Sequence, residues 1–225
     1  MRLKKLLSII LISFSSYLSA TKVAVAIKIT GNVSIHYAGE NNKQTLKPGS
    51  PLSSRDKIVT GENGFALIMY LDDKTTLKIL KNSTLEILGD RLDKTINKSI
   101  DIKYGKVAAN VKPQNGKDFT ISTPTSVASV KGTEFAVSSD PSTGDSFTLL
   151  EGLIEVTNSI TGQSTDVQEG ETAVSSPDGS LDVSQTTEED LNDFQDANIE
   201  MPAQELKFQI EDEDGNTKEI IIKFQ

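Results

Sequence analysis

The sequence predicts an all-β protein of many short strands in an elongated sandwich or β-roll, with one short helix and a β-hairpin near the C-terminus. Between Val23 and Val183, apolar residues recur at every second position in short runs, which is the period of a half-buried strand. Turn-forming residues separate these runs about every 8 to 12 residues, a spacing typical of sandwiches and barrels. No helix of ordinary length fits before residue 186.

The expected strands differ in how many of their faces are buried. Residues 33–37 and 100–104 alternate between apolar and polar side chains, so one face should pack on a core and the other should meet solvent. Residues 65–71 are apolar throughout, which a strand tolerates only when both faces are covered. Asn63-Gly64 before this segment and Asp72-Asp73 after it are turn residues. We therefore expect residues 65–71 to form a central strand.

The last forty residues change in character. Thr187 can cap a helix whose first turn carries Glu188, Glu189 and Asp190. Residues 206–210 and 219–224 then alternate on either side of an Asp-Gly turn, which predicts a terminal hairpin. This hairpin could offer an edge to a partner strand or cap the open end of the body.

The first twenty residues have the features of a secretory signal peptide. A basic start is followed by a mostly apolar stretch of about 13 residues and by small residues at Ser19-Ala20. A membrane-spanning helix needs roughly 20 apolar residues, so we expect cleavage after Ala20 rather than a stable membrane span. The predicted organisation is a signal peptide (1–20), an all-β domain (21–184) and an acidic tail (185–225), placed in the periplasm or secreted.

Composition argues against several classes of function. The chain has no cysteine, no tryptophan and one histidine, which removes thiolate metal sites and disulfide frameworks. The net charge of -9 opposes phosphate binding, so no nucleic-acid partner is expected. The charge is uneven, because residues 181–225 hold 13 acids and 3 bases. We interpret this tail as a solvated segment rather than a dedicated cation site.

The inventory of reactive side chains is small, and we expect no catalytic, cofactor-binding or metal-binding residues. His36 falls on the polar side of its strand, without a nucleophile motif around it. The pairs Asp72-Asp73 and Asp90 with Asp93 stand beside Lys74, Arg91 and Lys94 and resemble ordinary turn residues. Residues 212–219 contain part of a calcium-loop pattern, but Thr217 stands where the glycine belongs.

An ordered series of turn glycines, aliphatic residues and short motifs runs through residues 28–174. Its members are Gly49, Asp56, Thr60, Gly61, Gly64, Asp72, Gly105, Thr123, Pro124, Lys131, Gly132, Thr133, Glu134, Phe135, Glu151, Gly152 and Gly170. In this order they resemble the FecR domain, the periplasmic part of FecR-type regulators of bacterial iron uptake. Because most members are turn or core residues, the series specifies a fold more than a reaction.

The resemblance implies a regulatory module, with two departures. Lys131 stands where the family usually has arginine, and Asp73-Lys74-Thr75 replaces the usual Gly-Ser. FecR-type transducers also carry a cytoplasmic segment that engages a sigma factor, followed by a membrane span. Here only a signal peptide is expected before the domain, so direct sigma-factor control is not expected.

The function expected from these observations is that of an exported, non-enzymatic FecR-domain protein. It would act in the cell envelope as a protein-interaction or ligand-sensing module, with contacts made through exposed edge strands. The alternative is an envelope structural or glycan-binding protein without a signalling role. A third class, a hydrolase that uses two carboxylates, is left open, as is the oligomeric state.

Overall fold

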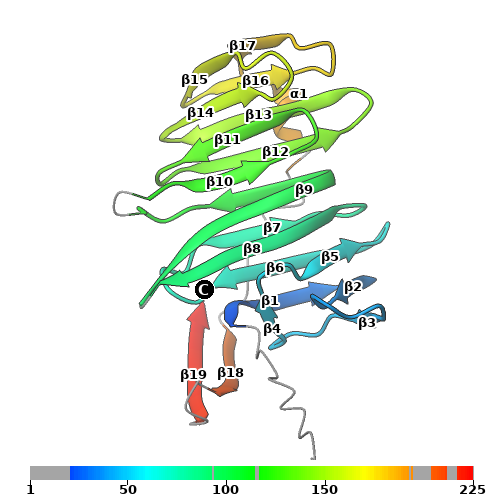
Figure 1. Ribbon diagram of the computed structural model, residues 1–225, viewed down its shortest axis with the longest axis vertical. Coiled ribbons are helices and arrows are strands. Elements are labelled where there is room, and N and C mark those ends of the chain that lie inside the picture. Colours follow the sequence, from blue (N-terminus) through cyan, green and yellow to red (C-terminus); the bar gives the residue numbers. More distant parts are fainter. Residues whose placement is uncertain are drawn as a thin grey trace, which may run out of the picture.

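The computed structural model describes residues 21–92, 94–114 and 117–192, together with Phe194 and the backbone of residues 204–211 and 217–224. Within this part, seventeen strands form one continuous sheet. The sheet folds into two facing layers, and the strands of each layer follow one another along the long axis of the molecule (Figure 1). The all-β prediction is confirmed.

The first layer runs from β4 at one end to β17 at the other. Its strands, in spatial order, are β4 (Pro51–Ser53), β1 (Lys22–Thr30), β6 (Phe65–Tyr70), β7 (Thr76–Ile79), the second half of β9 (Thr95–Asn110), β12 (Glu134–Asp140), β13 (Gly144–Glu151), β16 (Glu171–Ser175) and β17 (Leu181–Gln185). All of these neighbours pair antiparallel, as expected for strands joined by hairpins and short connections.

The second layer faces the first and runs from β3 to β15. Its strands, in spatial order, are β3 (Lys43–Thr45), β2 (Val33–His36), β5 (Lys57–Thr60), β8 (Thr84–Leu92), the first half of β9, β10 (Phe119–Ser122), β11 (Ser126–Val130), β14 (Leu153–Asn158) and β15 (Ser164–Gln168). The pairing of β9 with β10 is parallel.

Strand β9 belongs to both layers and joins them. Residues 99–101 pair with β10 in the second layer, whereas residues 105–110 pair with β12 in the first. Gly105 lies at the crossing with a φ of 102°, and a Cβ atom there would lie 2.4 Å from the hydroxyl of Ser83. Only glycine fits this bend without strain. The sequence indicates a strand over residues 100–104, and the structure extends it to sixteen residues.

The core fills the space between the layers and extends without a break from β1 to β17. The expected central strand is confirmed, because five of the six residues of β6 are buried. Its Tyr70 lies edge-on to Phe119, with ring centroids 6.0 Å apart. The buried Tyr70 hydroxyl donates hydrogen bonds to the carbonyl oxygens of Leu88 (3.3 Å) and Ser99 (3.1 Å).

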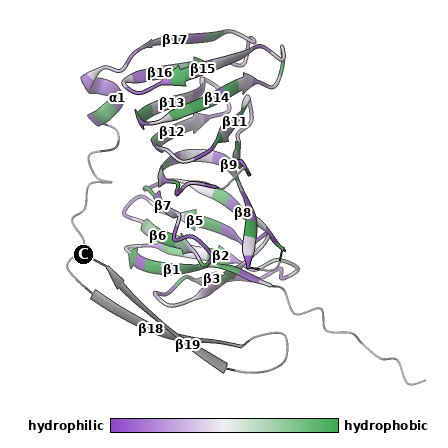
Figure 2. Ribbon diagram, turned by 90° about the vertical axis from the view of Figure 1, so that its left-hand side faces the viewer, coloured by the Kyte–Doolittle hydropathy of each residue, from purple (hydrophilic) through white to green (hydrophobic). Residues whose placement is uncertain are grey.

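The C-terminal elements follow the predicted order. Helix α1 (Glu188–Asn192) begins after Thr187, whose hydroxyl accepts a hydrogen bond from the Asp190 amide (3.3 Å). Figure 2 shows α1 beside the first layer. The hairpin consists of β18 (Gln204–Glu211) and β19 (Thr217–Phe224), which pair only with each other among the described strands. The short helix and the hairpin are therefore confirmed.

Two predictions fall on other parts of the chain. The expected signal peptide, residues 1–20, and the partial calcium-loop pattern at 212–216 lie outside the described residues. Among the helices that the structure describes, none has the length and apolar character needed to cross a membrane.

Candidate functional site

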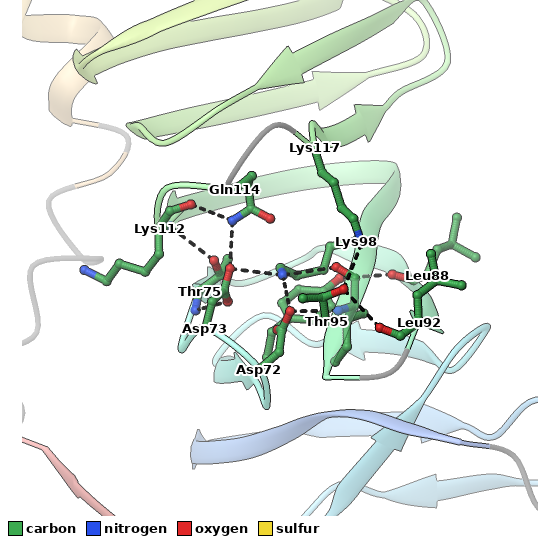
Figure 3. Close-up of polar contacts among 12 residues, drawn as sticks. Asp72, Asp73, Thr75, Leu88, Leu92, Thr95, Lys98, Lys112, Gln114 and Lys117 are labelled. Atoms are coloured by element: carbon green, nitrogen blue, oxygen red, sulfur yellow. Dashed lines mark hydrogen bonds and ion pairs between the residues drawn. The ribbon is translucent and has the colours of Figure 1, made fainter.

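A buried group of charged side chains lies where the β6–β7 turn meets the start of β9 (Figure 3). We call Asp72, Asp73, Lys98 and Gln114 the Lys98 cluster. The side chain of Lys98 is 2% exposed, and its Nζ atom lies 2.7 Å from Asp72 Oδ2 and 3.0 Å from Asp73 Oδ2. One ammonium group thus neutralises part of the charge of two adjacent carboxylates inside the fold.

The alternation of β9 explains why Lys98 is buried. Ile96, Lys98 and Ile100 occupy successive inward positions of the strand. The ammonium group lies 5.8 Å from the centre of the Tyr70 ring, and the Ile96 amide donates to Asp72 Oδ2 at 2.8 Å. A buried lysine needs charged or polar partners, and the β6–β7 turn supplies them.

The same cluster binds the segment that leads from β9 toward β10. Gln114 Nε2 donates to Asp73 Oδ2 at 2.7 Å, and the Lys112 amide donates to the hydroxyl of Thr75 at 3.2 Å. Burial would raise the pKa of the Asp73 carboxyl, but hydrogen bonds from the Thr75 amide, Lys98 and Gln114 hold it below its ordinary value. The cluster therefore fixes residues 111–114 against the turn.

The geometry is that of an internal ion-pair network, in which the Lys98 Nζ atom contacts Oδ2 of both carboxylates. Asp72 Oδ1 is buried and has no hydrogen-bond partner among the described residues. The sequence places Lys74, Arg91 and Lys94 beside the acids of this region, and all three are exposed. The buried ion pairs of Asp72 and Asp73 form with Lys98.

A second buried carboxylate, Asp145, organises the other half of the body. It is 1% exposed and accepts hydrogen bonds from Thr123 (2.5 Å), Ser126 (3.0 Å), Ser139 (2.6 Å) and Thr125. These hydroxyls come from the β10–β11 turn, from the first residue of β11 and from β12. Asp145 therefore holds the Thr123-Pro124 motif against β13.

Sequence reasoning missed both Lys98 and Asp145. Each carries a signal that could have been used, because each is a charged residue at an inward position of its strand. Lys98 stands between the inward Ile96 and Ile100, and Asp145 precedes the inward Phe147 and Leu149. Alternation marks such a residue as buried, and a buried charge needs a partner. The partners come from distant segments, so the alternation alone does not identify them.

The motif residues in the first half of the body secure turns. Asp56 accepts hydrogen bonds from the amides of Ala38 (2.9 Å) and Ser53 (2.7 Å), and burial raises the pKa of its carboxyl in spite of these bonds. The Thr60 hydroxyl donates to the Leu80 carbonyl oxygen at 2.5 Å. Gly61 and Gly64 lie against the backbone of the turn at Asn32, and Gly49 has a positive φ at an open position.

The motif residues in the second half lie at strand ends. Glu134 accepts a hydrogen bond from Asn110 Nδ2 at 3.3 Å. Phe135 is fully buried, Thr133 is buried with its hydroxyl unpaired among the described residues, and Lys131 is exposed. The remaining motif residues are Gly132, Gly152 and Gly170, all with positive φ, and Glu151, which is exposed.

Candidate catalytic or metal-binding groups do not assemble within the described residues. His36 is half-buried on β2, where its strand neighbours are Lys43 and Lys57. No group of three or more acid, histidine or cysteine side chains in this part of the chain could hold a metal ion.

Strand β17 is a candidate docking edge. It ends the first layer, and among the described strands it pairs only with β16. Ser176 N donates to Ser180 O at 2.9 Å and Thr186 N donates to Gly170 O at 2.8 Å. In an antiparallel ladder the bonded positions alternate, so the backbone groups of Leu181, Val183 and Gln185 point to the free side.

Two of the other three layer edges, β3 and β4, carry features that discourage strand addition, and the third, β15, has its one apolar residue, Val167, buried. β3 includes Lys43 and β4 begins at Pro51, and both residue types protect natural edges. β17 has neither lysine nor proline. Val183 is 37% exposed and the neighbouring Val174 is 43% exposed, so apolar surface accompanies the open backbone.

Comparison with known proteins agrees with this fold. Residues 56–155 match the family model described as FecR protein, and no curated protein matches the chain by sequence. Two crystal structures of a candidate anti-sigma factor from Parabacteroides distasonis ATCC 8503 are similar. One has 14% identity and a TM-score of 0.52, covering 61% of this chain and 63% of that one. The other has 15% identity and a TM-score of 0.50, covering 60% and 62%.

The chain spans about three fifths of the length of each of these structures, and at such identities the likeness concerns the fold alone. The family match lies inside the predicted range of 28–174 and includes most of the ordered motif series. Residues 56–155 of this chain are therefore similar to the FecR family.

Proposed function

We propose that this protein is an exported, non-enzymatic module of the cell envelope that binds a protein partner and takes part in signalling through that contact. The observation that carries the proposal is the open edge of β17, with its free backbone groups and exposed valines, on a domain of a regulatory family. A strand from a partner would extend the first layer by main-chain hydrogen bonds.

The buried charges favour this function over catalysis. The carboxylates of Asp72, Asp73 and Asp145 are all engaged by protein donors, and general acid or base work needs a carboxyl within reach of a substrate proton. These groups stabilise the turns that hold the strands in register. The surface, rather than a cleft, is then the functional part of the domain.

Recognition would combine two contributions. The outward amides and carbonyls of Leu181, Val183 and Gln185 would supply affinity for any extended backbone, and the exposed side chain of Val183 would favour an apolar residue beside it on the partner strand. The partner is therefore expected to present an extended segment with an apolar residue at the position next to Val183.

The test is in-cell crosslinking of the tagged full-length protein, followed by mass spectrometry of its N-terminus and of the captured proteins. A chain that begins at Thr21 and captures an envelope receptor or an inner-membrane regulator would support export and the signalling role. Capture of wall polymer or copies of itself alone would contradict the proposal and favour the structural or glycan-binding alternative. An intact Met1 would contradict export through a cleaved signal peptide.

A further inference from the structure

The first layer has an apolar outer face, on the side away from the core. Val25 and Ile27 of β1 and Leu67 and Met69 of β6 form a hydrophobic cluster separate from the main core. Strand alternation directs them opposite to Ala66 and the other inward residues. We call these four residues the outer apolar face.

This face is buried although it does not face the second layer. The four residues are between 0% and 7% exposed. The described strands of the body form two layers (Figure 2), and strand alternation directs these four side chains away from the second layer. In a two-layer structure the outer side of a strand is buried only when a third element covers it. The outer apolar face therefore requires an occupant.

Phe194 indicates which segment this is. It follows helix α1 and packs against Leu80, Ala108 and Ala136 on the same outer side of the first layer. Ala108 and Ala136 are register partners on the adjacent strands β9 and β12. The chain thus already lies on the outer side of this layer when it leaves residue 194.

We propose that the C-terminal segment that follows Phe194, residues 195–225, docks on the outer apolar face of its own domain. The distance from the Phe194 contact on β9 to the outer apolar face on β6 and β1 is short, because β7, β6 and β1 follow β9 in the layer at roughly 4.8 Å per strand. The ten residue steps from Phe194 to Gln204 can span about 33 Å. Figure 1 shows the hairpin near the end of the body that contains β1.

The chemistry of the segment matches the face. Residues 199 and 201 are Ile and Met, and the hairpin register places Leu206 opposite Ile222 and Phe208 opposite Ile220. Alternate positions of a strand share a face, so one side of the hairpin is apolar in sequence. These residues supply the apolar surface that the outer face needs.

Charge complementarity supports the same occupant. Lys78 is the register partner of both Leu67 and Ala108, so it lies on the outer side between the Phe194 contact and the outer apolar face. The proposed occupant, residues 195–225, holds 8 acids and 3 bases. Acids such as Asp196 and Glu200 stand between the apolar residues of this segment, where they can meet the lysine as the chain crosses β7.

The first test is zero-length carbodiimide crosslinking of the full-length protein, with mass spectrometry of the monomer fraction. We expect peptides that join Lys78 to acids of residues 195–211. Lys103, on the outer side of the second layer, is the control amine and should join none of them. Coupling of the tail to Lys103 but not to Lys78, or coupling only between two copies, would overturn the proposal.

The second test uses Met69, which lies in the outer apolar face, as the probe of whether that face is covered. Phe194→Ala should raise the rate of Met69 oxidation by peroxide several-fold, while Leu191→Ala, an exposed change three residues earlier, should leave it at the wild-type rate. An unchanged rate in Phe194→Ala, with the Lys78 crosslinks absent from the unmodified protein, would refute the docking. Neither test involves β17, so failure of the docking proposal is distinguishable from failure of the proposed function.

Discussion

Removal of the buried ammonium group is the sharpest perturbation of the Lys98 cluster. In the variant Lys98→Met the aliphatic stem is retained, but Asp72 and Asp73 lose a counter-ion that lies 2.7 Å and 3.0 Å away. The side chain of Asp72 is 9% exposed, so water replaces the lost interaction poorly. Loss of one partner of a buried ion pair costs about 3–5 kcal/mol, which corresponds to a fall in Tm of roughly 6–20 °C for a domain of this size.

The assay is urea unfolding at pH 7, followed by far-ultraviolet circular dichroism because the chain has no tryptophan. The matched control is Lys103→Met on the same strand, where a half-exposed lysine pairs with Asp101 and the expected cost is about 0–1 kcal/mol. Adding Asp72→Asn to Lys98→Met should recover part of the loss, because the unpaired charge is then removed. Equal costs for Lys98→Met and Lys103→Met would refute the reasoning.

Three further predictions follow from the same geometry. Asp145→Ala should lower the free energy of unfolding, measured with urea, by about 2–4 kcal/mol, since it leaves buried hydroxyls without their acceptor. A clearly smaller change would show that the hydrogen bonds to Asp145 are dispensable. Because the folded-state pKa of Asp73 is lowered, its stabilisation is present above the unfolded pKa and is lost as the pH falls through the folded value. The stability difference between wild type and Asp73→Asn should therefore shrink between pH 5 and pH 3, and a constant difference would contradict the assigned cause. Gly105→Ala should cost clearly more than Gly170→Ala in thermal unfolding, because both have positive φ but only the former meets a neighbour.

Sequence alternation was sufficient for the class of fold and for individual strands. The uninterrupted apolar run at residues 65–71 predicts a strand covered on both faces, and β6 has its inward residues in the core and its outward ones in the outer apolar face. The cap at Thr187 and the Asp-Gly turn at 214–215 likewise mark the helix and the hairpin. These are local signals, so neighbouring residues contain all the information.

The remaining features depend on strand order, which alternation does not contain. Residues 100–104 read as a separate strand, but Gly105 allows β9 to continue from one layer into the other. Lys98 pairs with acids 25 and 26 positions earlier, and Asp145 binds hydroxyls from two other elements. A single sequence cannot rank such contacts, because each is decided by which strands become neighbours.

The central claim is that the free edge of β17 binds the partner. Its most direct test compares Val183→Pro with Val183→Ala in crosslinking of the tagged full-length protein. Proline removes an amide that points away from β16, so the ladder with β16 is retained, while alanine keeps the amide and shortens the side chain. The account predicts that Val183→Pro loses the captured partner and Val183→Ala retains most of it, with both variants as stable to urea as the wild type within about 1 kcal/mol. Full capture by a folded Val183→Pro protein would contradict the claim.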